Sequence, residues 1–387
     1  MKEMTSRERI LAAMTGKEVD KVPVCPLLFV YLLDKYGSTA PETFIKFQQQ
    51  FDYDIIYTKE SSIPLSIEYA TSELSHTKDA VCTTQTWMEN KLTCIRREFR
   101  TPAGVVSDVT KIPPKGDRSY GISPNPFKTE WLIKERSDLD KLAYILPDPI
   151  KTCSTDSFTK TNSVIGNNGL TEMVIRSPVD NRAGCARGME NLMMDYYDDK
   201  GFFDEVLEFF AKYVMAETKF YLENGVNNIF GSWFYTSLSS GWSPNIFREC
   251  FILMMKKHVD LVHSYGAIYN LYDDERMNEV LEDYASTGTD VLQTLTPLPV
   301  GDLDLTEAKK RIGDKVCLYG HTDLIYTLFL GSVSEVEDSV RNAILTAGPG
   351  GRFILGTSDS IRDGTPEENV EAYFRTANKY RNYPIII

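Results

Sequence analysis

Short apolar runs alternate along the chain with longer segments of helical periodicity. The apolar runs predict eight strands, at 22–29, 54–58, 172–176, 228–230, 267–270, 290–293, 315–319 and 352–355. Helical periods fill most of the gaps between them, for example at 41–50, 188–199, 202–223, 244–264 and 275–286. Strands that alternate with helices indicate a parallel sheet. Eight such units predict an α/β protein that closes into a single (β/α)8 TIM barrel, one domain over residues 1–387.

Several predicted helices carry recognisable start signals. A Thr or Ser followed three residues later by Glu is typical of a capping box. Such pairs are Thr5 with Glu8, Ser334 with Glu337, and Thr365 with Glu368. Ser243 followed by proline marks the start of the helix at 244–264.

One segment, at about 79–150, interrupts the alternation of strands and helices. Apolar and polar residues alternate there from position 87, with turn residues at 102–104, which predicts an antiparallel β-hairpin inserted between the second and third barrel strands. The insertion is either a solvated decoration or a lid or partner-docking element over the barrel mouth.

Composition narrows the classes of function. The net charge of −13 over 387 residues argues against nucleic acid as a partner, because binding phosphates needs clustered Lys and Arg. The sequence has no apolar stretch long enough for a membrane span, and its start is a charged helix without the apolar core of a secretory signal, so we expect a cytoplasmic protein. The seven cysteines include no CxxC pair and are expected to be free thiols.

Active-site residues of such barrels lie at the carboxyl ends of the strands, so the residues that follow each predicted strand are candidates for the active site. They are Glu60 after the second strand, Arg182 after the third, Trp233 and Tyr235 after the fourth, Asn270, Tyr272 and Asp273 after the fifth, His321 and Asp323 after the seventh, and Asp359 after the eighth.

Four of these candidates, His321, Asp323, Asp359 and Asp273, suit proton chemistry or metal binding. His321 fits a general acid or base, or a metal ligand with Asp323 or Asp359; its alternative is a hydrogen-bonded structural histidine. Asp273 is either one of two paired acids or a helix cap. Tyr272 and Trp233 suit stacking against a flat ligand, and equally suit the core. HExxH, P-loop, GxGxxG and GxSxG motifs are absent, as is a His-x-Cys pair.

Both ends of the chain resemble uroporphyrinogen decarboxylase-like proteins. The segments that carry the resemblance are 5–14, 16–23, 177–178, 188–192, 320–323, 328–331, 334–336, 350–356 and 365–369. The resemblance spans nearly the whole chain and implies a (β/α)8 barrel. True decarboxylases carry an arginine-rich segment after the first strand and a histidine in the eighth-strand turn. Here residues 27–33 contain no arginine and the turn has Asp359, so a decarboxylase is discounted.

A second branch of the superfamily methylates thiols from a corrinoid and binds zinc through a His-x-Cys pair and a further Cys. The matching positions here are Asn270, Tyr272 and Asp359, so the usual zinc ligands are absent and the metal is left unknown. A third branch is similar in its tail, at 356–361, 369, 379–380 and 383–385. It takes a methyl group from a methoxylated aromatic or a similar small donor to a separate corrinoid protein.

The third branch implies an O-demethylase methyltransferase with cobalamin carried by a partner corrinoid protein. On this hypothesis, His321, Asp359, Asp273 or a metal held among them would supply the proton or positive charge that the leaving group needs, and the other strand-end candidates would bind the substrate. A homodimer is a candidate assembly. The alternatives are a decarboxylase-type lyase, a methylcobalamin-to-thiol or folate methyltransferase, and a relative that kept the barrel and lost the site.

Overall fold

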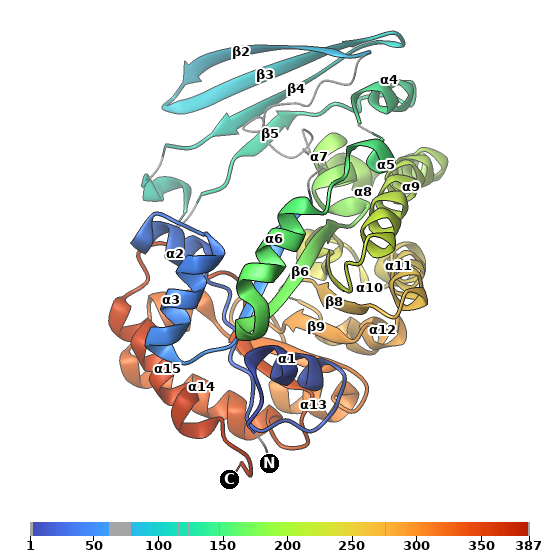
Figure 1. Ribbon diagram of the computed structural model, residues 1–387. Helices are drawn as coiled ribbons and strands as arrows, with labels where there is room; N and C mark the ends of the chain where they lie inside the picture. Colours follow the sequence, from blue (N-terminus) through green and yellow to red (C-terminus); the bar gives the residue numbers. More distant parts are fainter. Residues whose placement is uncertain are drawn as a thin grey trace. The chain divides into compact units, whose positions relative to one another are not determined.

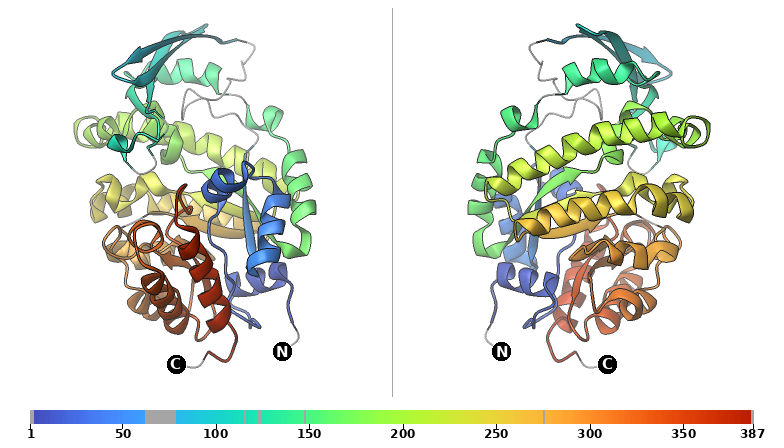
Figure 2. Two further views of the ribbon diagram at one scale, coloured as in Figure 1. Left: turned by 90° about the vertical axis from the view of Figure 1, so that its left-hand side faces the viewer. Right: turned by 90° about the vertical axis from the view of Figure 1, so that its right-hand side faces the viewer.

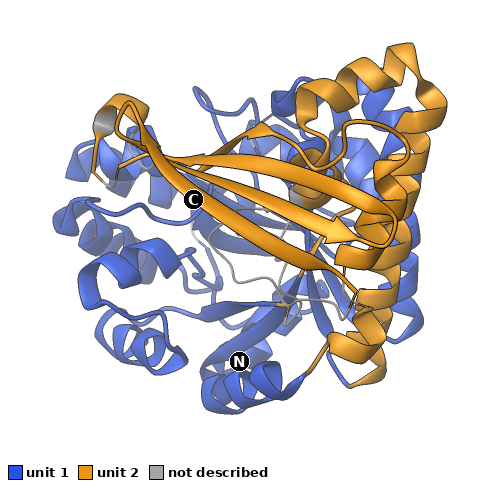
Figure 3. Ribbon diagram, turned by 90° about the horizontal axis from the view of Figure 1, so that it is seen from above, with its two compact units in different colours: residues 1–60, 155–174, 225–387 blue, residues 61–154, 175–224 orange. Residues whose placement is uncertain are grey.

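The computed structural model describes residues 3–61, 79–114, 116–121, 124–146, 148–274 and 276–385. They form two compact units. Unit 1 comprises residues 1–60, 155–174 and 225–387, and unit 2 comprises residues 61–154 and 175–224; Figure 3 colours them blue and orange. The predicted insertion at 79–150 belongs to unit 2, together with a later helical segment.

Unit 1 is built around a curled seven-stranded sheet with the strand order β1-β6-β7-β8-β9-β10-β11. Parallel pairing joins β1 to β6 and each strand from β7 to β11 to the next. The sequence predicted all seven, within a few residues at each end. They are β1 Ile55–Glu60, β6 Gly169–Arg176, β7 Asn228–Ser232, β8 Ile268–Tyr272, β9 Val291–Thr294, β10 Cys317–Thr322 and β11 Phe353–Thr357.

The predicted first strand at 22–29 is wrong as a regular strand. Val24 forms only an isolated bridge with Leu355 of β11, and Phe29 already begins a helix. Two prolines, Pro23 and Pro26, remove ladder donors from this segment, which explains why no strand extends. Backbone hydrogen bonds still link the segment to both sheet ends. At β11, Leu355 N donates to the Pro23 carbonyl at 2.9 Å and Cys25 N donates to the Leu355 carbonyl at 2.7 Å; beside β1, Asp54 N donates to the Val24 carbonyl at 2.8 Å.

Helices cover the outer face of this sheet, and both described ends of the chain lie at one side of the unit (Figure 2). The helices of unit 1 are α1 Ser6–Met14, α2 Phe29–Tyr36, α3 Pro41–Phe51, α6 Asp156–Ile165, α10 Pro244–Cys250, α11 Ile252–Ser264, α12 Leu281–Ser286, α13 Leu305–Ile312, α14 Val333–Ala347 and α15 Glu367–Tyr380. The helix predicted at 244–264 is broken at Phe251 into α10 and α11.

Two of the four predicted helix starts are confirmed. Thr5 forms a complete capping box on α1, and Ser243 caps α10 ahead of its first-turn proline. The box on α14 lies two residues earlier than predicted and uses Ser332 with Glu335, because α14 begins at Val333. The box predicted at Thr365 is not formed, since that hydroxyl donates to the Arg362 carbonyl instead.

A buried ionic cluster fastens the N-terminal helix and the last helix to the first strand. Arg9 of α1 and Arg381, just after α15, each donate to a different oxygen of Asp54 at 2.5 Å. Arg9 also makes two hydrogen bonds to Asp20, at 2.7 and 2.8 Å. Burial alone would raise the pKa of Asp20, but the Arg9 guanidinium outweighs it and lowers that pKa to about 2.

Unit 2 contains a four-stranded antiparallel sheet in the order β2-β3-β4-β5 (Figure 1). Its strands are β2 Val81–Glu89, β3 Leu92–Thr101, β4 Gly104–Ile112 and β5 Phe127–Glu130. The predicted hairpin is confirmed as β3 and β4, whose turn lies at residues 102–103, but the structure adds a strand on each side of it.

The helices of unit 2 are α4 Asp138–Ile145, α5 Pro149–Thr152, α7 Gly184–Ala186, α8 Met189–Asp198 and α9 Lys200–Glu223. Within the described part of the chain, no helix combines the length and the apolar character that crossing a membrane requires. All seven cysteines are free thiols.

Candidate active site

A buried carboxyl group lies on the inner face of the unit 1 sheet. Glu172 of β6 is fully buried and accepts hydrogen bonds from the Asn270 amide of β8, at 3.1 and 3.3 Å. The same Asn270 amide donates to Gln293 of β9 at 2.8 Å. Burial raises the pKa of Glu172 to about 7, although the Asn270 hydrogen bond opposes that rise. This carboxyl therefore holds and releases a proton near neutral pH.

The interior trio of Glu172, Asn270 and Gln293 has unused hydrogen-bonding groups. Asn270 Oδ1 and Gln293 Nε2 are buried and have no partner in the described structure. An acceptor and a donor left unpaired in a buried place cost free energy, and such groups are common where a ligand binds. The trio thus offers one acceptor, one donor and one titrating acid side by side.

Two residues further toward the carboxyl ends of β6 and β8, an aromatic layer is formed by Leu27, Val174, Phe230, Tyr272 and Phe234. Alternation along β6 and β8 puts Val174 above Glu172 and Tyr272 above Asn270. Val174 and Tyr272 pack with Phe230 and Leu27 in one buried cluster, against which Phe234 also packs. The Phe230 and Tyr272 rings are 5.0 Å apart between centroids. This layer suits contact with a flat apolar ring.

A cluster of polar side chains, those of Tyr272, Asp274 and Asp359, lies at the carboxyl edge of the sheet. The Tyr272 hydroxyl lies 3.2 Å from Asp274 Oδ2 and 3.4 Å from Asp359 Oδ1. Asp359 also accepts from Arg362 at 2.8 Å and from the Ser360 backbone at 2.6 Å. Two predicted residues from distant strands, Tyr272 and Asp359, are therefore brought together.

His321 lies elsewhere. Its φ of 134° is unusual for a residue with a side chain, and the side chain lines a cavity of about 430 Å³ with residues of α13 and α14. The Nδ1 atom donates to the Leu295 carbonyl at 2.8 Å, and burial lowers the pKa of His321. Among the described residues, no hydrogen bond or ion pair connects His321 to Asp359.

The side chains of Asp273 and Trp233 make hydrogen bonds outside the interior trio, although Asp273 N donates to the Gln293 carbonyl at 3.4 Å. Asp273 accepts from the Tyr284 hydroxyl of α12 and from the Asp274 backbone at 2.8 Å. Trp233 is fully buried and donates from its indole to the Tyr269 hydroxyl at 2.8 Å, and that hydroxyl contacts His258 Nδ1 at 2.9 Å.

The remaining predicted residues are dispersed. Arg182 is buried in unit 2, where it binds Glu217 at 2.5 Å. Asp323 begins a helical turn by accepting from the backbone of Tyr326 and Thr327. Tyr235 is half-buried beside the Phe234 ring, and Glu60 is exposed at the end of β1.

The residues at the positions that bind zinc in thiol methyltransferases do not fit a zinc site. The Asn270 amide nitrogen faces Glu172 and Gln293, and Tyr272 offers a hydroxyl beside two carboxylates. Neither a thiolate nor an imidazole is supplied there. In the described ranges, no three His, Cys, Asp or Glu side chains are arranged to hold a metal ion.

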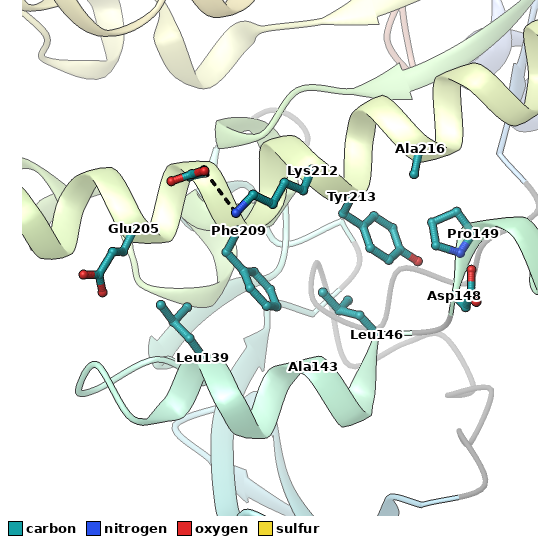
Figure 4. Close-up of a pocket in the computed structure, with 11 residues that line it drawn as sticks. Leu139, Ala143, Leu146, Asp148, Pro149, Glu205, Phe209, Lys212, Tyr213 and Ala216 are labelled. Atoms are coloured by element: carbon teal, nitrogen blue, oxygen red, sulfur yellow. Dashed lines mark ion pairs between the residues drawn. The ribbon is translucent and has the colours of Figure 1, made fainter.

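A second cavity, of about 580 Å³, lies within unit 2 between α4 and α9 (Figure 4). Leu139, Leu146 and Phe209 approach one another across it. Its charged rim is internally matched, because Lys212 pairs with Glu208 at 3.0 Å. None of the residues that line it has an unpaired buried polar atom, so the interior trio is the stronger candidate for chemistry.

Sequence reasoning missed Glu172 and Gln293. The signal for Glu172 was present, since it is a charged residue directly before the apolar run 173–175 of the strand. The search for strand-end residues passed over both because they lie within strands and not after them.

Comparisons with known proteins agree with this architecture. Residues 175–380 match the sequence model of the family described as Uroporphyrinogen decarboxylase (URO-D). The methylcobamide:CoM methyltransferase MtaA of Methanosarcina barkeri is 23% identical over 397 residues, which cover 98% of this chain and 99% of that protein. The chloroplastic uroporphyrinogen decarboxylase 2 of Oryza sativa subsp. japonica is 24% identical over 201 residues, which cover 51% and 48%.

Among solved structures, a methyltransferase from Methanosarcina mazei has a similar fold. Its TM-score is 0.62 at 18% identity, and the alignment covers 98% of this chain and 99% of that one. The matched family region is more than half of the chain and includes most strands of the unit 1 sheet. The protein therefore belongs to the uroporphyrinogen decarboxylase (URO-D) family.

Proposed function

We propose that this protein is a corrinoid-dependent methyltransferase that takes the methyl group of a methoxylated aromatic and passes it to a corrinoid carried by a separate protein. The observation that carries the proposal is the full-length similarity to a methylcobamide:CoM methyltransferase, combined with an inner site in which Asn270, at one of the zinc-ligand positions, binds the titrating acid Glu172 instead. The similarity to the rice decarboxylase covers only about half of each chain.

The aromatic layer supports a ring-shaped donor. Phe230, Tyr272 and Phe234 present aromatic surface, and Leu27 and Val174 complete an apolar contact. A methoxylated ring placed there would bury its faces and direct its ether oxygen toward the interior trio. The unpaired Gln293 amide would donate to that oxygen, and Asn270 Oδ1 would accept from a neighbouring hydroxyl of the ring.

The leaving group determines what the chain must do. Breaking the methyl–oxygen bond leaves both electrons on the oxygen, and a phenolate is a poor leaving group unless it is protonated. The reduced corrinoid supplies the electron pair that the methyl carbon accepts. Glu172, with its pKa raised to about 7, supplies the proton that turns the phenolate into a phenol.

The other polar residues position and shield the donor. Asp359 is held by Arg362 and Ser360 and fixes the Tyr272 hydroxyl, which borders the aromatic layer. His321 and Asp273 bond to Leu295 and Tyr284 instead, so we assign them no proton transfer to the donor. No step is assigned to zinc, because the residues present do not fit it.

The test mixes the purified protein with a reduced corrinoid protein, or with free cob(I)alamin, and a panel of methoxylated aromatics and methylamines. Formation of methylcobalamin with a methoxylated aromatic, followed by its absorption spectrum, is the expected result. Folded protein that methylates the corrinoid from none of the donors would contradict the proposal. The matched variants are Asp359→Ala and His321→Ala, of which the first should lower the rate more.

A decarboxylase-type lyase is the second candidate, and the family match favours it. It would act without a corrinoid and release carbon dioxide. In true decarboxylases the segment that matches residues 27–33 binds the carboxylates of a tetrapyrrole. This chain is poorly suited to that binding, because α2 carries one cation, Lys35, and Glu367 forms an ion pair with it. Carbon dioxide release from a porphyrinogen in the absence of corrinoid would establish this alternative.

A further inference from the structure

The two faces of the antiparallel sheet in unit 2 differ in how their charged side chains meet water. On one, the exposed face, the side chains of Arg96 and Glu130 are 36% and 44% exposed. On the other, the buried face, those of Arg97, Asp108 and Lys128 are at most 5% exposed. Water stabilises an unbalanced charge on the exposed face but cannot reach one on the buried face.

On the buried face, two cations share one carboxylate. Arg97 donates to Asp108 from Nε at 2.9 Å and also from Nη2, and Lys128 donates to the same carboxylate at 2.7 Å. Burial lowers the pKa of Lys128, and the opposing effects of Asp108 and of the Cys185 thiol do not cancel that lowering. The positive charge of Lys128 is therefore incompletely balanced by its surroundings.

Two buried groups beside these cations have no hydrogen-bond partner in the described structure. They are Arg97 Nη1 and Thr110 Oγ1. Thr110 is fully buried, lies two residues beyond Asp108 on β4 and so on the same face, and pairs directly with Lys128 of β5. A guanidinium N–H and a hydroxyl can both donate to an acceptor, and leaving them unpaired costs free energy. Such groups are common where a ligand binds.

An irregularity in β5 keeps its acid away from its lysine. Consecutive residues of β4 pair with Glu130 and with Lys128, so β5 has one extra residue, Thr129, at this point. In a regular strand Lys128 and Glu130 would share a face, because they are two residues apart. Instead, Glu130 lies 3.4 Å from Arg96 on the exposed face, and Lys128 stays on the buried face without it.

We propose that the buried face binds the carboxylate group of a small organic acid between Arg97 Nη1, Thr110 Oγ1 and Lys128 Nζ. The ligand supplies the negative charge that the second cation lacks, and its oxygens accept from the two unpaired donors. A carboxylate suits three donors, because its two oxygens only accept and together offer about four lone-pair positions. The acid is small because the residues that hold it are buried. The site lies within unit 2 and does not depend on the proposed enzymatic function.

The experiment follows thermal unfolding of the full chain while sodium chloride is replaced by sodium formate or sodium acetate at constant ionic strength and pH. A ligand that binds only the folded state raises the Tm with its concentration. The wild-type Tm should therefore rise with both acids, and isothermal titration calorimetry of the same solutions should show saturable binding of one acid per chain. Absence of saturable binding of either acid overturns the proposal.

Two variants locate the site. Lys128→Met removes the unbalanced cation and leaves the pair of Arg97 with Asp108 in place, so it should weaken the affinity for formate at least about tenfold. Thr110→Val removes one hydroxyl with little change in shape and should weaken it about three- to tenfold, which keeps the test decisive if Lys128→Met does not fold.

The matched control makes the same change beside the exposed face. Lys134 lies 3.8 Å from Glu130 and is 52% exposed, so Lys134→Met should bind formate like the wild type. Circular dichroism confirms that each variant is folded. Folded Lys128→Met and Thr110→Val proteins that keep the wild-type affinity overturn the proposal. So does an equal loss of affinity in Lys134→Met, which would indicate a general effect of charge.

Discussion

Two of the carboxyl groups buried within unit 1, those of Asp54 and Glu172, have different surroundings. Asp54 precedes β1 and meets two arginines, Arg9 and Arg381, at 2.5 Å each. Glu172 lies within β6, and its hydrogen-bond donor is the neutral amide of Asn270. Both side chains are almost entirely inaccessible to solvent.

The difference teaches where to look for chemistry in this fold. The Asp54 carboxylate forms ion pairs with two arginines, and it fastens α1 and the end of α15 to the sheet. A buried carboxyl group without a neighbouring cation has a raised pKa, because burial disfavours its charged form. A raised pKa is useful for proton transfer in catalysis and not for an ion pair that joins two elements. Sequence alone shows an acid in or beside a strand in both cases.

The largest expected effect comes from removing the structural carboxylate. Asp54→Ala leaves Arg9 and Arg381 without their shared partner and should lower the free energy of unfolding by about 3–5 kcal/mol. Urea denaturation followed by circular dichroism measures this change. The protein that remains folded should keep its specific activity. A loss of activity without a loss of stability would mean that the two carboxyl groups have been assigned the wrong roles.

The next effect concerns pH. Because the pKa of Glu172 rises from 4.5 to about 7 on folding, the folded state binds more protons than the unfolded state between those values. The contribution of Glu172 to the free energy of unfolding is therefore greatest below pH 4.5, and it falls by about 3 kcal/mol as the pH rises through 7. Unfolding free energies measured at pH 5 and pH 8.5 test it. Glu172→Gln should remove this part of the decline and be the more stable protein at the higher pH.

Glu172→Gln should also separate stability from activity. Glutamine keeps the size and the hydrogen-bonding capacity of the side chain but has no proton to give, so kcat/KM for methyl transfer should fall by about 100-fold or more. Initial rates of corrinoid methylation measure it. The wild-type rate should itself decline as the pH rises through 7, where the acid form is lost. A Glu172→Gln enzyme with undiminished rates would remove Glu172 from the mechanism.

The smallest effect is expected at the carboxyl edge of the sheet. Asp359→Asn weakens the bonds with Arg362 and Tyr272 that position the side chains bordering the donor, and should lower kcat/KM by about tenfold. Tyr272→Phe should have a similar effect and mainly raise KM. Asp304→Asn, beside the His321 cavity, is the control and should leave the rate unchanged.

The sequence predicted the repeated strands well because each has a local signal. Seven of eight apolar runs became strands, and the turn between β3 and β4 follows from its own residues. The first strand failed because Pro23 and Pro26 interrupt its ladder. The hairpin pattern did not predict that β2 and β5 join the same sheet, since their pairing depends on contacts between distant segments.

The candidate site was predictable only in part. The strand-end rule places Tyr272 and Asp359 at the same edge of the sheet, and the structure brings them within 3.4 Å. The same rule cannot say that His321 turns toward α13 and α14, because that depends on a backbone conformation with φ of 134°. It also cannot reveal that Asn270 connects Glu172 to Gln293, since the three lie on different strands.

The sequence by itself determined the alternation of strands and helices, the acidic character and the family to which the chain belongs, because these depend on local periodicity, composition and motif order. Only the tertiary structure decided which buried acid is neutralised. Arg9 and Arg381 lie 45 and 327 positions from Asp54 along the chain, and no ion pair joins Glu172 to a cation among the residues that the structure describes. The pKa of a buried acid is set by what folding brings within a few ångströms of it, and no local pattern encodes that distance.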